Sequence, residues 1–439
     1  MANAGQTKST LDGLMKDVYS NEKLESLVPD YAILKKLVKF DTANKIGRDF
    51  IKSVSLTREN GFSYGESLTT ALEGIISSNV DDAKVRGADM TLRAGWTYSV
   101  AHSMASSKAA FIDQTAHKFM CMMDSAAFRL EAQMIHGNGG ILVTDASTGT
   151  ASPATGDYLT AVTNTKYVVV AIDPLRYSDA IVSGLENANI SFFLASDNST
   201  PSAAAGPGNV ANKFSVSSVD LSAKSITVEC YDGSAASSLV TELEAAAYLV
   251  KFFGAHSNEM IGLRSIVSNT GTLYGIAGAS YSAWKGNSVA VGTANLTLKK
   301  VLIGVGKAVG RGLAERAVVL VNPQTFATMA NDEAALRQYT AKTSVGDRGV
   351  SSIEYVGSNG PIEIIAHPLV HESEAIAFPI AKASRIGSTD LTFARPGSDG
   401  EMLFDMQSYG GVEARLFTSQ AIFLPAPAHS VLFTGISNS

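Results

Sequence analysis

Alternating apolar and polar positions predict two extended strands between residues 51 and 102. The second stretch shows the pattern best, because every other residue is apolar and those between them are mostly polar. The apolar row consists of Met90, Leu92, Ala94, Trp96, Tyr98 and Val100. A period of two is typical of a strand with one buried face. The first stretch, residues 53–58, also alternates, and a polar segment at residues 77–82 separates the two. Together they predict an extended hairpin with a mobile tip.

The predicted hairpin has no obvious partner in the neighbouring sequence. A two-stranded hairpin is only marginally stable in water unless something covers its apolar face. No third strand is evident nearby along the chain. We therefore expect another subunit to supply the missing cover.

A single long helix is predicted directly after the hairpin. Residues 103–136 contain neither proline nor glycine, and their apolar residues recur at spacings of three and four. This spacing is typical of an amphipathic helix. At about 1.5 Å per residue it would span roughly 50 Å before the glycine-rich residues 137–140 end it. We interpret it as a structural beam, and an ordinary core helix of a large α/β enzyme is the alternative.

The remaining sequence mixes helical and extended patterns without a regular period. Two short helical patterns, at residues 10–19 and 31–40, predict an N-terminal arm, and further helices are expected at 176–187 and 299–313. Strands are predicted at residues 167–172, 214–229, 248–253, 317–321, 353–356, 362–365 and 413–424. Because no βαβ repeat is present, the pattern favours an irregular α+β architecture over a doubly wound sheet or an eight-fold barrel.

Composition excludes several classes of protein. The chain has 439 residues, of which 45% are hydrophobic and 17% charged, enough for a substantial core. No signal peptide and no apolar run of membrane-spanning length is recognisable, so we expect no membrane association. The net charge of −6 argues against a surface built to grip nucleic acid. The two cysteines, Cys121 and Cys230, cannot form a disulfide framework and fit synthesis in a reducing cytoplasm.

A partial glycine motif does not predict nucleotide binding. Gly304, Gly306 and Gly310 resemble a phosphate-binding loop. However, they lie within a helical pattern instead of joining a strand to a helix, and no Gly-Lys-Ser/Thr ending follows. We interpret them as small residues for close helix packing.

A cluster of possible metal ligands is also unconvincing. His367, His371, Glu372 and Glu374 combine imidazole and carboxylate groups, which suit zinc or iron. Pro368 disfavours a helix that would present both histidines on one face, so a polar loop is the better interpretation. Neither a Gly-x-Ser-x-Gly motif nor a cysteine set near a histidine appears convincingly. We expect no enzymatic activity, no cofactor and no metal.

The order of these parts resembles a known family. A helical arm, a long hairpin, a spine-like helix and an interleaved α+β body are similar to the major capsid proteins of tailed bacteriophages, which share the Hong Kong 97 fold. Residues 54–64 (VSLTRENGFSY) resemble the ascending arm of the family's extended loop, and residues 111–136 its spine helix. Segments similar to the body of a podovirus-like branch are NEMIGL (258–263), SNTGTL (268–273), IEIIAHPLV (362–370), GVEARLF (411–417) and QAIFL (420–424).

The resemblance implies a domain organisation. It divides the chain into an N-terminal arm (1–50), an extended hairpin loop (51–102), a peripheral domain with the spine helix (103–170), an axial domain (171–379) and a C-terminal return to the peripheral domain (380–439). A β-rich insertion is expected at about residues 188–247.

The resemblance also implies self-assembly. Copies of the chain would form hexamers and pentamers of an icosahedral shell that encloses double-stranded DNA, within a virion assembled in the host bacterial cytoplasm. A separate scaffolding protein, a portal and decoration proteins are the other expected partners, with non-specific contact to the packaged DNA. Intersubunit contacts are predicted at Arg58, Arg86, Met90, Leu92, Arg93, Trp96 and Tyr98.

Two further interpretations compete with a phage shell. Within the same fold, the chain could build an encapsulin-like cellular compartment around an enzyme cargo. From a different class, a soluble α/β enzyme with dispersed carboxylates is motivated only by chain length and the glycine motif. Some members of the family cross-link a loop lysine, but we interpret Lys84 as a solvated lysine near the predicted tip.

Overall fold

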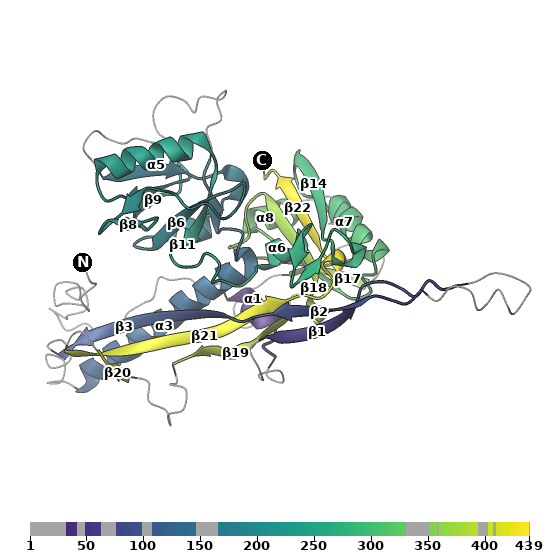
Figure 1. Ribbon diagram of the computed structural model, residues 1–439, viewed down its shortest axis with the longest axis horizontal. Coiled ribbons are helices and arrows are strands. Elements are labelled where there is room, and N and C mark those ends of the chain that lie inside the picture. Colours follow the sequence, from purple (N-terminus) through teal and green to yellow (C-terminus); the bar gives the residue numbers. More distant parts are fainter. Residues whose placement is uncertain are drawn as a thin grey trace, which may run out of the picture.

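A computed structural model describes residues 32–41, 49–62, 76–98, 108–145, 166–330, 352–357, 360–393, 403–406 and 410–438. Long strands and one long helix form a layer along one side of the molecule, and two compact sheets stand on it (Figure 1). A two-stranded ribbon extends from the layer toward one end of the molecule. This mixture of mixed and antiparallel sheets with interspersed helices confirms the predicted α+β class.

The long layer is built by strands from distant parts of the sequence. Strand β3 (Ala88–Thr97) pairs antiparallel with β21 (Gly411–Phe423) along most of its length, from Thr97 opposite Gly411 to Ala88 opposite Gln420. The opposite edge of β21 pairs with β19 (Ser384–Thr392) and β20 (Leu403–Asp405). Helix α3 (Lys108–His136) packs against β3 and β21.

The predicted long helix is present as α3, which has 29 residues. Its first predicted residues, 103–107, lie outside the described residues. The helix ends where expected, because the Gly137 N–H donates the last bond to the Gln133 carbonyl at 2.8 Å and Asn138 then adopts a positive φ of 62°. A left-handed residue after the last turn is a common helix stop.

The hairpin differs from its prediction in both pairing and tip. Strand β1 (Phe50–Ser55) pairs with β2 (Val80–Val85), not with residues 89–100. Part of the polar segment predicted as the tip is therefore strand, and Lys84 lies opposite Ile51. The cause is that β21 supplies a longer partner for β3, which the local sequence could not reveal. Residues 63–75 lie outside the described part of the chain.

The first compact sheet is a six-stranded antiparallel arrangement that closes on itself. Its strands, in spatial order, are β4 (Leu142–Val143), β11 (Tyr248–Phe252), β6 (Asn189–Leu194), β9 (Phe214–Asp220), β10 (Ser225–Glu229) and β5 (Tyr167–Ala171). A bridge between Thr144 and Ile172 connects the two edges, so the sheet forms a small barrel. Helix α5 (Gly233–Ala245) packs against β5, and its N-terminus is capped by Asp232.

The second compact sheet is mixed. Its order is β14 (Asn287–Ala294), β22 (Val431–Ile436), β18 (Glu374–Pro379), β15 (Ala317–Val321), β17 (Gly360–Ala366) and β16 (Ser352–Gly357). Helix α7 (Leu298–Gly310) packs against β14 and β22, and α8 (Pro323–Ala330) against β17. The predicted strands at 317–321, 353–356 and 362–365 and the helix at 299–313 are confirmed.

Short elements connect these layers. They are α1 (Ile33–Leu37), α4 (Asp179–Val182), α6 (Leu263–Val267), β7 (Ala205–Gly206), β8 (Val210–Ala211), β12 (Thr272–Leu273), β13 (Ile276–Ala277) and the 3-10 turns Pro174–Arg176, Ser282–Trp284, Ile380–Lys382 and Pro427–His429. The helix predicted at 176–187 is wrong except for the single turn α4, since buried Tyr177 and Leu185 pack into an irregular connection. The helix predicted at 10–19 lies outside the described residues.

The predicted domain boundaries remain predictions. Residues 188–247, expected as a β-rich insertion, supply β6 to β10 and α5. Strands β6, β9 and β10 share the barrel with flanking strands β4, β5 and β11, whereas β7 and β8 pair with each other outside it. Within the expected C-terminal return, β19 to β21 lie in the long layer, whereas β22 lies in the second sheet.

The interpretation of the glycine motif as a packing feature can be tested by substitutions at Gly304 and Gly306. A Cβ atom at Gly304 would lie 2.4 Å from two ring atoms of buried Phe433, whereas one at Gly306 would meet nothing within 4 Å. We expect Gly304→Ala to lower the free energy of unfolding by about 1–3 kcal/mol through overpacking. The matched Gly306→Ala variant should be neutral or slightly stabilising, because alanine favours a helix. Urea denaturation measures both, and equal stabilities would contradict the packing role.

Candidate intersubunit surface and the buried joint

The apolar row of β3 faces helix α3 of its own chain. Trp96 is 7% exposed and clusters with Met122, Ala126 and Leu416, and its ring centroid lies 6.5 Å from that of Phe119. Met90 and Leu92 are partly buried against the same cluster. Helix α3 of the same chain therefore supplies the cover that was expected from a neighbouring subunit. The assignment of Met90, Leu92 and Trp96 to intersubunit contacts stays a prediction. Replacing Trp96 by a charged residue would test folding before it tested contacts between subunits.

The polar row of β3 faces away from α3 and carries a charged group. Arg93, whose side chain is 62% exposed, donates to Glu413 at 2.6 Å, and Arg415 also donates to this carboxylate at 2.6 Å. Burial alone would raise the pKa of Glu413, but the hydrogen bonds from both arginines hold this pKa below its usual value. Tyr98 is 48% exposed, and its hydroxyl lies 3.3 Å from an Asp405 carboxylate oxygen. The assignment of Arg93 and Tyr98 to intersubunit contacts stays a prediction.

The hairpin has one face packed on the body and one face open. On the inner side, Ala83 and Val85 are buried, and Phe50 packs edge-on against Phe423 at 5.5 Å between ring centroids. On the other side, Ile51 is 54% and Val80 57% exposed. We call Ile51, Ser53, Ser55, Val80, Asp82 and Lys84 the outer hairpin face, since they alternate with the inner residues.

Exposure continues beyond the paired strands. Phe62 is 75% exposed and Ile76 58%, and both lie farther along the hairpin than the outer hairpin face. Arg58 and Arg86, two predicted contact residues, are also exposed. Isolated exposed apolar residues are ordinary, but a concentration of them on one projecting element is typical of an interaction surface. The pattern analysis missed Ile51, Val80, Phe62 and Ile76 because it assigned burial to the wrong strand.

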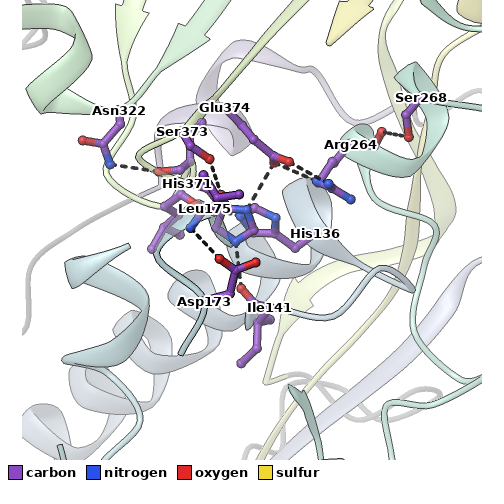
Figure 2. Close-up of polar contacts among 12 residues, drawn as sticks. His136, Ile141, Asp173, Leu175, Arg264, Ser268, Asn322, His371, Ser373 and Glu374 are labelled. Atoms are coloured by element: carbon purple, nitrogen blue, oxygen red, sulfur yellow. Dashed lines mark hydrogen bonds and ion pairs between the residues drawn. The ribbon is translucent and has the colours of Figure 1, made fainter. Parts of the chain in front are cut away.

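A buried polar cluster connects the C-terminal end of α3 to the rest of the subunit. We call His136, His371, Glu374 and Arg264 the buried joint (Figure 2). Arg264 donates to both oxygens of Glu374, at 2.6 and 2.7 Å, and the His371 Nδ1 lies 3.2 Å from one of them. The rings of His136 and His371 stack with centroids 4.0 Å apart. These contacts join α3, α6 and β18.

The joint corrects the interpretation of residues 367–374 as a polar loop. His367, His371 and Glu374 are buried, at 0%, 1% and 4% exposed. Their partners come from elements far away in sequence, which is why the pattern suggested solvent. Burial would raise the pKa of Glu374, but hydrogen bonds from His371 and Arg264 hold it well below the usual value. Within the described residues, no group of three or more His, Cys, Asp or Glu side chains could hold a metal ion.

A second buried carboxylate anchors the arm residues. Glu131 of α3 is fully buried and accepts hydrogen bonds from the backbone N–H groups of Leu34 and Lys35, and from His367 Nε2 at 2.9 Å. His367 Nδ1 accepts from the Leu369 N–H at 3.2 Å, so the hydrogen in the bond to Glu131 is donated by His367 Nε2. Sequence reasoning missed Glu131 and Arg264, since a single polar residue on an amphipathic helix carries no distinguishing signal.

With this geometry established, solved structures identify the fold. No protein-family description matches the sequence, and no curated protein is similar to it. The capsid asymmetric unit of cyanophage A-1(L) matches with a TM-score of 0.51 and 11% identity, over 98% of this chain and 100% of that chain. The capsid of a native GTA particle gives 0.48 at 10% identity over 99% and 100%, and an encapsulin complex from Synechococcus elongatus 0.44 at 9% over 99% and 97%.

The chain has the Hong Kong 97-type fold of capsid-like proteins. The alignment with the cyanophage capsid extends over nearly the whole chain, so the fold includes the long layer as well as both compact sheets. At 11% identity the likeness establishes the fold alone. In the part of the chain that the structure describes, no helix is long and apolar enough to cross a membrane.

Proposed function

We propose that this protein is the major capsid protein of a tailed bacteriophage, in which many copies assemble into an icosahedral shell around double-stranded DNA. The fold shared with the cyanophage capsid supports a shell-building role. The observation that carries the proposal is the outer hairpin face, with exposed Ile51 and Val80 on a projecting ribbon. In this proposal a neighbouring copy covers the outer hairpin face.

Contacts at the outer hairpin face would be individually modest. Burying an exposed isoleucine or valine contributes about 1.5–3 kcal/mol, at roughly 25 cal/mol per Å² of apolar area. An exposed ion pair from Arg58, Arg86 or Arg93 would add about 0–1 kcal/mol. Each copy in a closed shell would make the same contacts, so small contributions repeat across the assembly. Shell strength in this proposal comes from repetition.

A charge placed on the outer hairpin face should block assembly without unfolding the subunit. We expect Ile51→Asp to reduce particle yield at least about tenfold, because losing about 1.5 kcal/mol per contact already corresponds to that factor. Leu175→Asp is the matched control, since Leu175 is equally exposed at 54% but lies on the body of the molecule. Sedimentation and negative-stain microscopy measure particles, and circular dichroism checks the fold. Normal particles from Ile51→Asp would contradict the assignment.

The contents of purified particles separate a phage capsid from a cellular compartment. A phage shell should protect double-stranded DNA from added nuclease, whereas an encapsulin-like compartment would hold an enzyme cargo. Agarose electrophoresis after nuclease treatment, together with mass spectrometry of co-purifying proteins, distinguishes these outcomes. Co-purifying scaffolding, portal or decoration proteins would support the phage reading, and their sequences would test the podovirus-like branch. The protein itself has a structural role and catalyses no reaction in this proposal.

A further inference from the structure

The two stacked histidines of the buried joint have different hydrogen-bonding surroundings. His136 Nε2 lies 2.7 Å from the Leu369 carbonyl oxygen and therefore carries a hydrogen. Its other nitrogen, Nδ1, is buried and has no hydrogen-bond partner. The neutral ring suits this site, because a bare lone pair needs less compensation than a buried N–H or a charge.

The surroundings of His136 oppose a second proton. The His371 ring is stacked on it, with its Nε2 2.9 Å from the Ile141 carbonyl oxygen and its Nδ1 toward Glu374. The Glu374 carboxylate already accepts hydrogen bonds from His371 and Arg264. These bonds compensate its negative charge, so it stabilises a protonated His136 less than a free carboxylate would. Arg176 and Asp173 lie next around Arg264 and Glu374. A proton on His136 Nδ1 would thus create a buried N–H without an acceptor.

We propose that His136 is an acid-sensitive lock that holds the end of the long helix to the body and releases it when the ring is protonated. His136 is the last residue of α3, and its hydrogen bond to Leu369 and its stack on His371 both cross from the helix to the segment before β18. Protonation favours a state in which the ring reaches water, and reaching water requires those contacts to open. This inference does not depend on which shell the protein builds.

The direction of the effect follows from the titration of His136. Burial lowers the pKa of His136 well below its usual 6.5, and the neighbouring His371 lowers it further. A histidine with a depressed pKa in the closed state contributes full stability above pH 6.5 and loses it as the pH falls toward the depressed value. One proton changes the opening equilibrium by at most about tenfold per pH unit, equivalent to about 1.4 kcal/mol.

Hydrogen–deuterium exchange of the full-length subunit tests the lock. After correction for the intrinsic pH dependence of exchange, protection of peptides covering residues 130–142 and 366–376 should fall by up to about tenfold per pH unit below 6.5. Protection of β15 in the second sheet should not change with it. In His136→Gln, which keeps a neutral N–H donor, this pH dependence should disappear. The control His256→Gln removes a histidine that contacts Lys251 outside the joint and should behave as the parent.

Two outcomes would overturn the proposal. One is an unchanged pH dependence of protection at the joint in His136→Gln, and the other is pH-independent protection in the parent protein. A second measurement needs no variant and applies if His136→Gln fails to fold. Exchange of the imidazole C2 hydrogen, followed by mass spectrometry, reports the titration of His136 in the parent chain. A midpoint below 6.5 supports the lock, and a midpoint at or above 6.5 refutes it.

Discussion

Replacing Arg264 by methionine is expected to lower the free energy of unfolding of the subunit by about 3–5 kcal/mol. The side chain of Arg264 is 13% exposed, and it donates two hydrogen bonds to Glu374, whose side chain is 6% exposed. Methionine fills similar volume but leaves the carboxylate buried with only His371 as its partner. Removing one member of a buried ion pair is costly because the other charge loses its compensation.

A solvent-exposed ion pair supplies the control for Arg264. Arg316 pairs with Glu363, with side-chain exposures of 44% and 19%. We expect Arg316→Met to change stability by only about 0–1 kcal/mol, since water screens such pairs. Urea denaturation followed by tryptophan fluorescence and far-UV circular dichroism measures both variants. If Arg264→Met is no less stable than Arg316→Met, Glu374 is not held as the joint requires.

Replacing Gly262 by alanine is the second large effect, and we expect a loss of about 3 kcal/mol or more, at the upper end of overpacking. A Cβ atom at Gly262 would lie 2.4 Å from the Gly137 backbone nitrogen and 2.7 Å from the Ile135 carbonyl oxygen. Backbone atoms cannot rotate away as a side chain can, so the end of α3 would have to move. The Gly262 N–H also donates to the Gly137 carbonyl at 2.9 Å, which this movement would weaken.

Gly271→Ala provides the comparison for Gly262. A Cβ atom at Gly271 meets nothing within 4 Å, so this variant should retain the stability of the parent. Thermal unfolding and the proteolytic sensitivity of the segment after α3 report on the two variants. Wild-type stability in Gly262→Ala would contradict the close packing of the α3 terminus against residues 260–262.

Local patterns predicted the regular elements well, for a physical reason. A helix and a strand each impose a period on their apolar residues, so α3, α7, β5, β11, β15 and β21 were visible in the sequence. The glycine-rich stop after His136 and the packing role of Gly304 followed from the same local chemistry. The predicted helix at 176–187 failed because tertiary packing of Tyr177 and Leu185 replaced local hydrogen bonding.

The sequence pattern could not predict which distant segments pair with or bury one another. The row from Met90 to Trp96 was correctly predicted to need a cover, but the cover is α3 and β21 of the same chain. Because the pattern assigned the open apolar face to the wrong strand, it did not identify Ile51 and Val80 as exposed. Their exposure depends on which face of the hairpin packs against the body. His371 and Glu374 were interpreted as solvated because their partners, Ile141 and Arg264, lie far from them along the chain.

By itself, the sequence determined the α+β class and the long helix with its glycine stop, since these depend on residue periodicity and on chain stops. Tertiary structure alone decided which strand pairs with β3, which face of the ribbon stays open, and that His136, His371, Glu374 and Arg264 form one buried joint. The physical reason is that burial and electrostatic environment are properties of neighbours in space. No local pattern specifies those neighbours when they are separated by more than a hundred residues.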